Sequence, residues 1–273
     1  MTDTEYMRRA LELAGRGVGW TSPNPMVGAV VVKDGRVIGE GFHERCGEAH
    51  AERNALAHCT ESPAGATMYV TLEPCCHQGR QPPCTDAILE AGIARVVVGS
   101  DDPNPLVAGK GIDILRRAGV EVETGVLKAE CDALNYVFFH YITTGLPYVV
   151  MKYAMTLDGK IATCSGKSKW ITGEAARDRC TATAAATGPS WPGSAPSLRT
   201  TRCLTAASRR ARPRPRHLRL TPAHPLTSRI VATAREIPTI LATVSADKEA
   251  PPLRGRGLPG LDAPGARRTA RPH

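Results

Sequence analysis

The feature that most constrains this chain is the segment TLEPCCHQGRQPPC at 71–84, which holds three cysteines and a histidine. The chain has nine cysteines in all, an odd number. Its first residues, MTDTEYMRRALELAGRG, are predicted to form an amphipathic helix and not a signal peptide. Reduced thiols or metal ligands are therefore favoured over a disulfide framework, and a cytoplasmic protein is expected. No run of about 18 apolar residues occurs, so no membrane helix is expected.

The sequence HAE at 50–52 supplies the rest of a predicted zinc site. Zinc prefers Cys and His ligands, and a catalytic zinc keeps one of its four positions for water. His50 opens a predicted helix, Cys75 follows a predicted strand and Cys84 closes the loop, so these three residues are the predicted ligands. The order H-x-E followed by P-C and a later Cys is typical of zinc deaminases, in which the Glu, here Glu52, transfers protons and does not bind the ion. A purely structural zinc is the alternative, but it would leave Glu52 without a role.

The loop between the two predicted cysteine ligands is longer than in the usual C-x-x-C spacing. Eight residues, CHQGRQPP, separate Cys75 from Cys84. The loop carries His77 and Arg80, and an arginine guanidinium binds phosphate in a bidentate manner. A substrate with a phosphate group is therefore expected.

Helical and strand patterns alternate through the first half of the chain, which predicts a layered α/β sandwich. The predicted elements are a helix at 3–14, a hairpin at 27–41, a helix at 49–59, a strand at 66–72, a helix at 85–92, a strand at 93–100, a helix at 110–119, a strand at 120–125 and a helix at about 127–141. A boundary is predicted at Gly145–Pro147, and a strand-like run follows at 147–163.

The composition changes abruptly beyond Arg177. Residues 179–228 contain no Val, Ile, Phe, Tyr, Met, Asp, Glu or Lys, so they are predicted to be disordered. Residues 229–250 return to ordinary α/β sequence, and 251–273 are again predicted to be a disordered tail. Abrupt blocks rich in Arg, Pro and Ala suggest a reading-frame slip in a GC-rich gene, and a natural basic, proline-rich tail is the alternative.

The excess of basic residues behind the net charge of +9 lies entirely in residues 179–273. Residues 179–273 hold 17 Lys and Arg against 4 Asp and Glu, whereas residues 1–178 hold 18 against 22. A deaminase that acts on RNA or single-stranded DNA needs a basic groove lined by aromatic side chains. The acidic body and an aromatic content of 4% argue against that alternative. A second alternative is a non-catalytic remnant that zinc only stabilises.

Six stretches make the chain resemble the bifunctional riboflavin-biosynthesis deaminase/reductase family, RibD. They are SPNPMVGAVVV at 22–32, GEGFHERCGEAHAE at 39–52, TLEPCCHQGRQPPC at 71–84, DDPNPLVAGKG at 101–111, PYVVMKYAMTLDGKIAT at 147–163 and SKWITGEAAR at 168–177. They occur in the family's order over residues 5–177, and the long cysteine loop separates this family from cytidine, guanine and tRNA deaminases.

The resemblance implies a fold, a reaction and a set of site residues. Residues 1–145 would form a cytidine-deaminase-like three-layer α/β/α sandwich that deaminates 2,5-diamino-6-ribosylamino-4(3H)-pyrimidinone 5′-phosphate to 5-amino-6-(5-phosphoribosylamino)uracil. Zinc would be held by His50, Cys75 and Cys84, with Glu52 as the proton shuttle. The implied substrate contacts are Asn24, His43, His77, Arg80 and Asn104; for each, a loop residue that caps backbone groups is the alternative.

The second half of the family is an NADPH-dependent reductase with a dihydrofolate-reductase-like fold. Residues 146–178 match its start, where Ala154, Ser168 and Trp170 would contact the cofactor or substrate. The pattern is then lost in 179–228 and returns only in 229–250. An incomplete reductase domain with absent or weak activity is therefore expected, because hydride transfer needs both faces of the cofactor pocket. The family also suggests a homo-oligomer, with no nucleic-acid or membrane partner.

Overall fold

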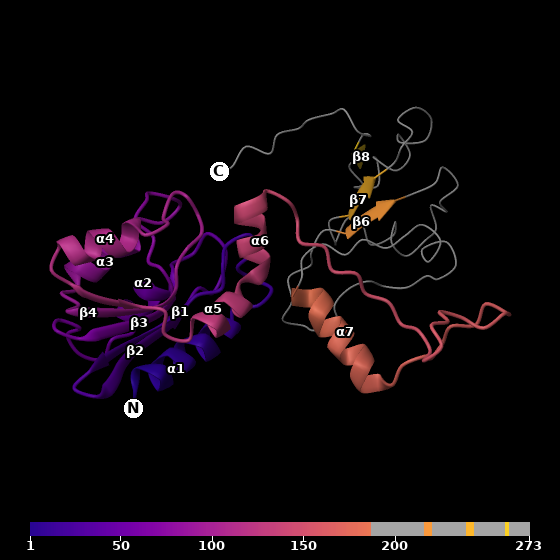
Figure 1. Cartoon of the computed structure of the whole chain (residues 1–273), viewed down its shortest axis with the longest axis horizontal. Helices are drawn as coiled ribbons and strands as arrows, with labels where there is room; N and C mark the ends of the chain where they lie inside the picture. Colours follow the sequence, from indigo (N-terminus) through magenta and orange to yellow (C-terminus); the bar gives the residue numbers. More distant parts are fainter. Residues whose placement is uncertain (187–215, 220–238, 243–259, 262–273) are drawn as a thin grey trace. The chain divides into compact units, whose positions relative to one another are not determined.

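The computed structural model describes residues 1–186 and three short strands at 216–219, 239–242 and 260–261 (Figure 1). The chain divides into two compact units, Met1–Val149 and Val150–His273. This division lies close to the domain boundary that the sequence predicts after residue 145. None of the described helices is both long and apolar enough to span a bilayer.

The first unit is built on one mixed sheet of five strands in the order β2-β1-β3-β4-β5. The strands are β1 (Gly28–Lys33), β2 (Arg36–Phe42), β3 (Thr67–Leu72), β4 (Arg95–Ser100) and β5 (Glu121–Thr124). β1 is antiparallel to both β2 and β3, whereas β3, β4 and β5 are parallel. The predicted hairpin is confirmed, with Asp34 and Gly35 at the turn, both at positive φ.

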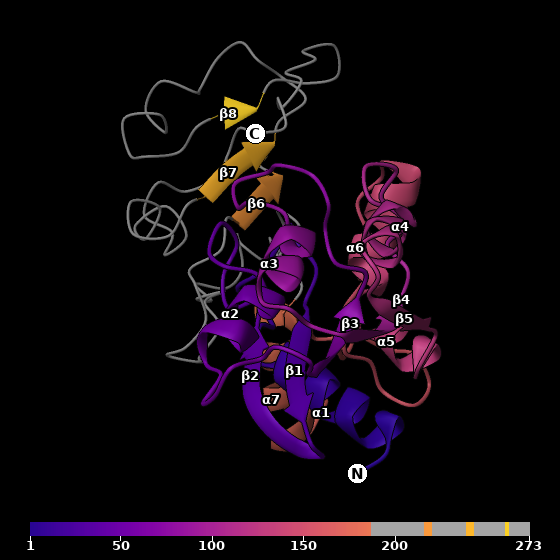
Figure 2. The same ribbon diagram turned by 90° about the vertical axis from the view of Figure 1, so that its left-hand side faces the viewer.

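Helices cover both faces of this sheet, as Figures 1 and 2 show. α1 (Asp3–Gly15) and α5 (Lys128–Leu134) lie on one face; α2 (Ala51–Ala57), α3 (Cys84–Glu90) and α4 (Lys110–Arg117) lie on the other. α1 begins with a capping box in which Thr2 and Glu5 bond each other's backbone amides, which satisfies two helix-end donors. The predicted α/β/α sandwich is confirmed.

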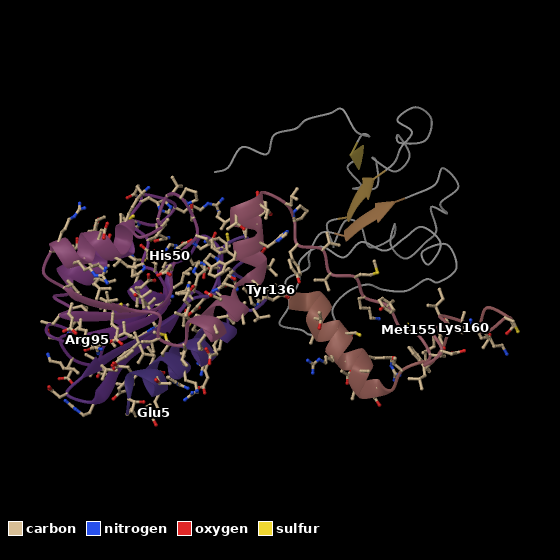
Figure 3. All side chains as sticks on the ribbon, viewed as in Figure 1. Glu5, His50, Arg95, Tyr136, Met155 and Lys160 are labelled. Atoms are coloured by element: carbon tan, nitrogen blue, oxygen red, sulfur yellow. The ribbon has the colours of Figure 1, made fainter. Side chains whose placement is uncertain are left out.

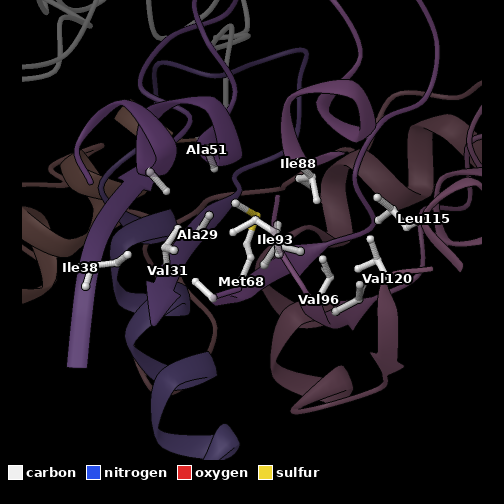
Figure 4. Packing of buried hydrophobic residues seen from close by; sticks show 14 residues of the cluster. Ala29, Val31, Ile38, Ala51, Met68, Ile88, Ile93, Val96, Leu115 and Val120 are labelled. Carbon is white, nitrogen blue, oxygen red and sulfur yellow. The ribbon is translucent and has the colours of Figure 1, made fainter. Parts of the chain in front are cut away.

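Side chains that alternate along the strands form two cores, one on each face. Figure 4 shows the larger one, where Val31, Met68 and Val96 pack beneath Ala51 and Ile88. The intervening strand residues point the other way and pack with α1. Burying each Val or Met side chain contributes about 1.5–3 kcal/mol, so these two layers fix the strand register.

The topology brings four loops to one edge of the sheet. Parallel β3 and β4 end at this edge, and the segments that follow are 73–83 and 101–109. Because β1 is antiparallel to both of its neighbours, its start and the end of β2 lie at the same edge, which adds loops 20–27 and 43–49. The predicted site residues of the deaminase half all lie on these four loops or at the N-terminal ends of α2 and α3.

The predicted helix at 127–141 is wrong in one respect: it is two helices. α5 ends at Leu134, and α6 runs over Tyr136–Thr144, with Asn135 between them at φ −112° and ψ 19°. The apolar pattern continues across this point, so periodicity alone does not reveal the break. The Asn135 side chain instead makes long-range contacts, described below.

Residues 147–163, which begin at the end of the first unit and continue into the second, contain no strand, contrary to the sequence prediction. A strand needs a hydrogen-bonded partner, and the side chains of Val149, Met151 and Leu157 are exposed. α7 (Glu174–Ala186) extends past residue 179, where composition predicts disorder to begin. Its six alanines have the highest helix propensity, which outweighs the absence of larger apolar residues.

A small parallel sheet, β6-β7-β8, is the other described element of this unit. It consists of β6 (Arg216–Arg219), β7 (Thr239–Ala242) and β8 (Gly260–Leu261). β6 falls within the predicted disordered segment 179–228, β7 within the predicted fragment 229–250 and β8 within the predicted tail 251–273. The rest of those three predictions, beyond Ala186 and outside the strands, lies outside the described residues.

Candidate active site

The structure brings the three predicted zinc ligands together. The Nδ1 atom of His50 lies 3.5 Å from the Cys75 Sγ and 3.3 Å from the Cys84 Sγ, and the three ligand atoms all lie within 4.8 Å of one another. Zinc bonds of about 2.3 Å to sulfur and about 2.0 Å to nitrogen in a tetrahedron place neighbouring ligand atoms about 3.5 Å apart. The donor set and its spacing therefore fit zinc.

Local backbone structure explains why these side chains meet. His50 is the N-cap residue of α2, in an extended conformation, and Cys84 is the first residue of α3. The Cys75 carbonyl accepts hydrogen bonds from the amides of Cys84 (3.0 Å) and Thr85 (3.2 Å), so the cysteine loop closes on itself. α2 in turn lies tightly against β2: a Cβ at Gly41 would come within 2.3 Å of the Ala55 amide nitrogen.

The three groups strongly influence one another's protonation. The hydrogen bond from Cys84 lowers the pKa of Cys75 to about 4, even though burial acts in the opposite direction. The same hydrogen bond, together with burial, raises the pKa of Cys84. The contact with Cys75 raises the pKa of His50. A thiolate is therefore already favoured at Cys75, and thiolates are the form that binds metal.

Glu52 lies in the first turn of α2, close to these ligands. Its side chain is buried, and its carboxyl group is within hydrogen-bonding reach of the Cys84 thiol. Burial, followed by the negative charge of Cys75, raises the pKa of Glu52. A carboxyl group with a raised pKa takes up a proton more readily than an ordinary glutamate, which suits a group that must accept a proton and return it.

Asn24 and His43 form a hydrogen-bonded pair beside His50. The ring of His43 is 5.3 Å from that of His50, in an edge-to-face arrangement, and burial lowers the pKa of His43, so the ring is neutral. Its Nδ1 lies 3.0 Å from the Ala49 carbonyl and must donate there. Its Nε2 therefore accepts from the Asn24 Nδ2 at 3.3 Å. Both His43 nitrogens are thus occupied, so a direct substrate contact is less suited to His43 than to Asn24.

The other three predicted substrate contacts lie on the 73–83 loop, which holds the cysteines, and on the 101–109 loop. His77 has a buried Nδ1 that no group within the described residues satisfies. Arg80 is exposed beside Gly47, whose carbonyl accepts from Gln81. The Oδ1 of Asn104 accepts from the Leu106 amide at 3.1 Å, which is the backbone-capping role given above as the alternative.

One buried carboxylate, Glu73, organises the loop that carries Asn104. Its Oε2 accepts from the amides of Gly109 (3.0 Å) and Asp102 (3.4 Å), and its Oε1 accepts from those of Gly111 (3.0 Å) and Ile112 (3.3 Å). Glu73 thus ties the 101–109 loop and the start of α4 to the strand end that leads to the Cys75 thiolate. The sequence shows only a Glu before Pro-Cys, so this role is not predictable from the motif.

Asp102 is a second buried carboxyl group in this loop. Burial raises its pKa to about 6, although the hydrogen bond from the Asn104 amide opposes the shift. The residue is absent from the set that the sequence predicts.

The predicted reductase residues are not assembled into a site in the described structure. Ala154 is half-buried, and Ser168 and Trp170 are exposed. The Arg177 guanidinium stacks 4.4 Å above the Trp170 ring. Within the described residues, no hydrogen bond joins Ala154, Ser168 and Trp170.

Two family models match the chain. The one described as the cytidine and deoxycytidylate deaminase zinc-binding region matches residues 1–100, and the one described as the RibD C-terminal domain matches residues 147–252. The second match runs through 179–228, where composition predicts that the resemblance lapses.

Curated relatives carry the same family name. The riboflavin biosynthesis protein RibD of Actinobacillus pleuropneumoniae is 55% identical over 252 residues, which cover 90% of this chain and 66% of that protein. RibD of Escherichia coli is 52% identical over 177 residues, covering 65% of this chain and 48% of the relative. The chain thus spans between about half and just under two thirds of the length of these relatives.

Solved structures agree with the sequence comparisons. The crystal structure of a diaminohydroxyphosphoribosylaminopyrimidine deaminase/5-amino-6-(5-phosphoribosylamino)uracil reductase from Thermotoga maritima matches with a TM-score of 0.85 and 42% identity, covering 92% of this chain and 72% of that one. Acinetobacter baumannii RibD matches with a TM-score of 0.85 and 40% identity, covering 96% and 74%.

Proposed function

The chain belongs to the RibD family of riboflavin-biosynthesis proteins, and on that premise we propose that it is a zinc-dependent hydrolytic deaminase. Its substrate would be 2,5-diamino-6-ribosylamino-4(3H)-pyrimidinone 5′-phosphate, and its products 5-amino-6-(5-phosphoribosylamino)uracil and ammonia. The observation that carries the proposal is the cluster of His50, Cys75 and Cys84 with a buried carboxyl group, Glu52, beside it. Three protein ligands leave one zinc position open, as a catalytic site requires.

In this proposal the chain's residues divide the work between binding and proton transfer. His50, Cys75 and Cys84 would hold zinc, which when bound makes hydroxide available near neutral pH and acts as a Lewis acid. Glu52 would take a proton from the attacking water and deliver it to the pyrimidine ring nitrogen. It would then carry a second proton, from the hydroxyl group newly bonded to the ring carbon, to the amino group that leaves as ammonia. Its burial supports this role, because the raised pKa lets the carboxyl group carry a proton between the two steps.

Substrate recognition is assigned to the loops at the same sheet edge. Asn24 would accept a hydrogen bond from the substrate through Oδ1, since His43 already holds its Nδ2 and no donor in the described residues bonds the Oδ1. His77 would use its unsatisfied Nδ1, and exposed Arg80 would bind the phosphate. Asn104 would act through its amide nitrogen, because its oxygen caps the loop.

The family's second activity, NADPH-dependent reduction of the ribose, is proposed to be weak or absent in this chain. Residues 179–228 contain no Val, Ile, Phe or Tyr, and within the described residues no hydrogen bond joins Ala154, Ser168 and Trp170. Purified protein mixed with the deaminated intermediate and NADPH is expected to show no loss of absorbance at the NADPH wavelength. A measurable rate that depends on the intermediate would refute this expectation.

The main experiment combines zinc quantification with ammonia release from the pyrimidine phosphate. The wild-type protein is expected to bind one zinc per chain and to release ammonia. Glu52→Ala should abolish turnover and keep the zinc. Glu44→Ala, at an exposed glutamate in the nearby 43–49 loop, should leave both turnover and zinc content unchanged. If the wild-type protein bound zinc but released no ammonia, the structural-zinc alternative would hold.

Location and assembly complete the proposal. We expect a cytoplasmic enzyme that acts on a small molecule and forms a homo-oligomer. Light scattering on the purified full chain tests the oligomer, and a monomer mass over the working concentration range would contradict it.

A further inference from the structure

Asn135 is a buried amide that bonds a distant backbone segment at two points. Its side chain is 3% exposed, in the break between α5 and α6. The Asn135 Oδ1 accepts from the Met26 amide at 2.8 Å, and its Nδ2 donates to the Met26 carbonyl, also at 2.8 Å. The two residues are 109 positions apart, so this clamp joins the end of the unit to the first loop of the site.

The clamped segment is the one that presents Asn24. The Asn24 amide donates to the Thr21 carbonyl at 2.9 Å, and the Val27 carbonyl accepts from the His43 amide at 2.9 Å. Met26 lies between these two anchors, and its own backbone groups are both bonded to Asn135. The 20–27 loop is therefore fixed on either side of Asn24, and the position of the Asn24 side chain depends on it.

Only asparagine suits this clamp among residues of its size. A primary amide offers an acceptor and donors in the geometry of a peptide group. It therefore pairs with both backbone groups of Met26, as a residue of a neighbouring strand would. Aspartate would place a carboxylate oxygen against the Met26 carbonyl, and alanine would leave the partly buried amide and carbonyl of Met26 without partners. A structural helix break alone would require neither the donor nor the acceptor.

We propose that Asn135 is a positioning residue for the deamination site, acting through Met26 on the orientation of Asn24. The proposal rests on the proposed function, because Asn24 is taken to contact the pyrimidine. Asn135 does not touch the substrate itself. Its effect is on the placement of Asn24, and a displacement of about 1 Å in a substrate-binding group can cost about a hundredfold in rate.

A double-mutant cycle separates this role from a general loss of structure. Asn135→Ala is expected to lower kcat/KM by about 10- to 100-fold in the wild-type background, and by less than about twofold in an Asn24→Ala background. Zinc content should remain one per chain in all variants. Thr143→Ala, at an exposed position in α6, serves as the control with unchanged kinetics. An equal loss from Asn135→Ala in both backgrounds would overturn the proposal.

A second readout does not depend on turnover. Hydrogen exchange at the Met26 amide should be faster in Asn135→Ala than in wild type, and unchanged exchange there would overturn the clamp. If Asn135→Ala does not fold, Asn135→Asp, which keeps the acceptor for the Met26 amide, takes its place in the cycle with the same expectation. If wild-type protein releases no ammonia, the proposed function fails, and the exchange result alone then supports or refutes the clamp.

Discussion

Replacing Glu73 by glutamine should destabilise the first unit while leaving its core unchanged. The carboxylate accepts from four backbone amides, two at each oxygen, and these amides belong to the 101–109 loop and the start of α4. Glu73→Gln keeps the shape of the side chain but turns one oxygen into an NH₂ group. That group faces amide hydrogens and cannot accept from them.

The magnitude follows from the two amides that lose their acceptor. A buried donor without a partner costs about 1–3 kcal/mol. At either Glu73 oxygen, the amide with the longer hydrogen bond contributes the smaller part of the loss in stability. Loss of a negative charge at the N-terminus of α4 adds about 0.3–1 kcal/mol. Relief of the desolvation of a buried carboxylate offsets part of this cost. The expected loss is about 2–4 kcal/mol, a large share of the ~5–15 kcal/mol typical of a domain.

Urea unfolding of the zinc-loaded protein measures this loss as a shift in the transition midpoint at constant slope. Glu90→Gln, at an exposed glutamate that ends α3, is the matched control and should change stability by less than about 0.5 kcal/mol. Amide exchange at Gly109 and Gly111 should also become faster in Glu73→Gln. A loss below about 1 kcal/mol, with unchanged exchange at both amides, would refute this account of the loop.

Three further predictions concern the metal, the packing of α2 and pH. Removing zinc with a chelator should lower the Tm, and zinc but not magnesium should restore it, since thiolate and imidazole ligands select zinc; equal rescue by magnesium would contradict the ligand assignment. Gly41→Ala should lower the free energy of unfolding by about 1–3 kcal/mol and weaken zinc affinity, because its Cβ would meet α2 backbone atoms within 2.3–2.7 Å and displace the helix that begins after His50. Chelator competition measures the zinc affinity, and an unchanged affinity would contradict this coupling between α2 packing and metal binding. The pKa of Asp102 is raised from 3.8 to about 6, so the stability that its protonated form contributes is present below pH 3.8 and is lost as pH rises through 6. The free energy of unfolding should fall by about 3 kcal/mol over this range, and Asp102→Asn should remove this fall. Urea unfolding at several pH values between 4 and 7 checks this, and parallel curves for the two proteins would contradict it.

The sequence was most informative for features that depend on local residue patterns. Spacing and residue type predicted the ligand set His50, Cys75 and Cys84, because each lies at a helix or strand end that periodicity also locates. Apolar runs bounded by turn residues predicted the five strands, and the runs are continuous in β1, β3 and β4 because both faces of these strands are buried.

Contacts between distant segments could not be read from such patterns. Asn135 interrupts an apolar helical pattern as any polar residue would, and only the folded chain shows its amide on Met26. Glu73 similarly reads as part of a motif, whereas its four donors come from a loop and the start of a helix about thirty to forty residues away. The strand predicted at 147–163 failed for a related reason: an apolar run becomes a strand only when a partner offers hydrogen bonds.

The edge of the sheet opposite the four site loops has a practical use. The β1–β2 turn at Asp34 and Gly35 lies there, as does the Arg95 guanidinium, paired with Asp3 and labelled in Figure 3 well apart from His50. Both turn residues are solvent-facing and adopt the left-handed conformation that a short connection demands. A fluorescent reporter or an affinity peptide spliced between them would lie at the opposite end of the strands from His50, so the labelled protein could be followed while the candidate site stays native.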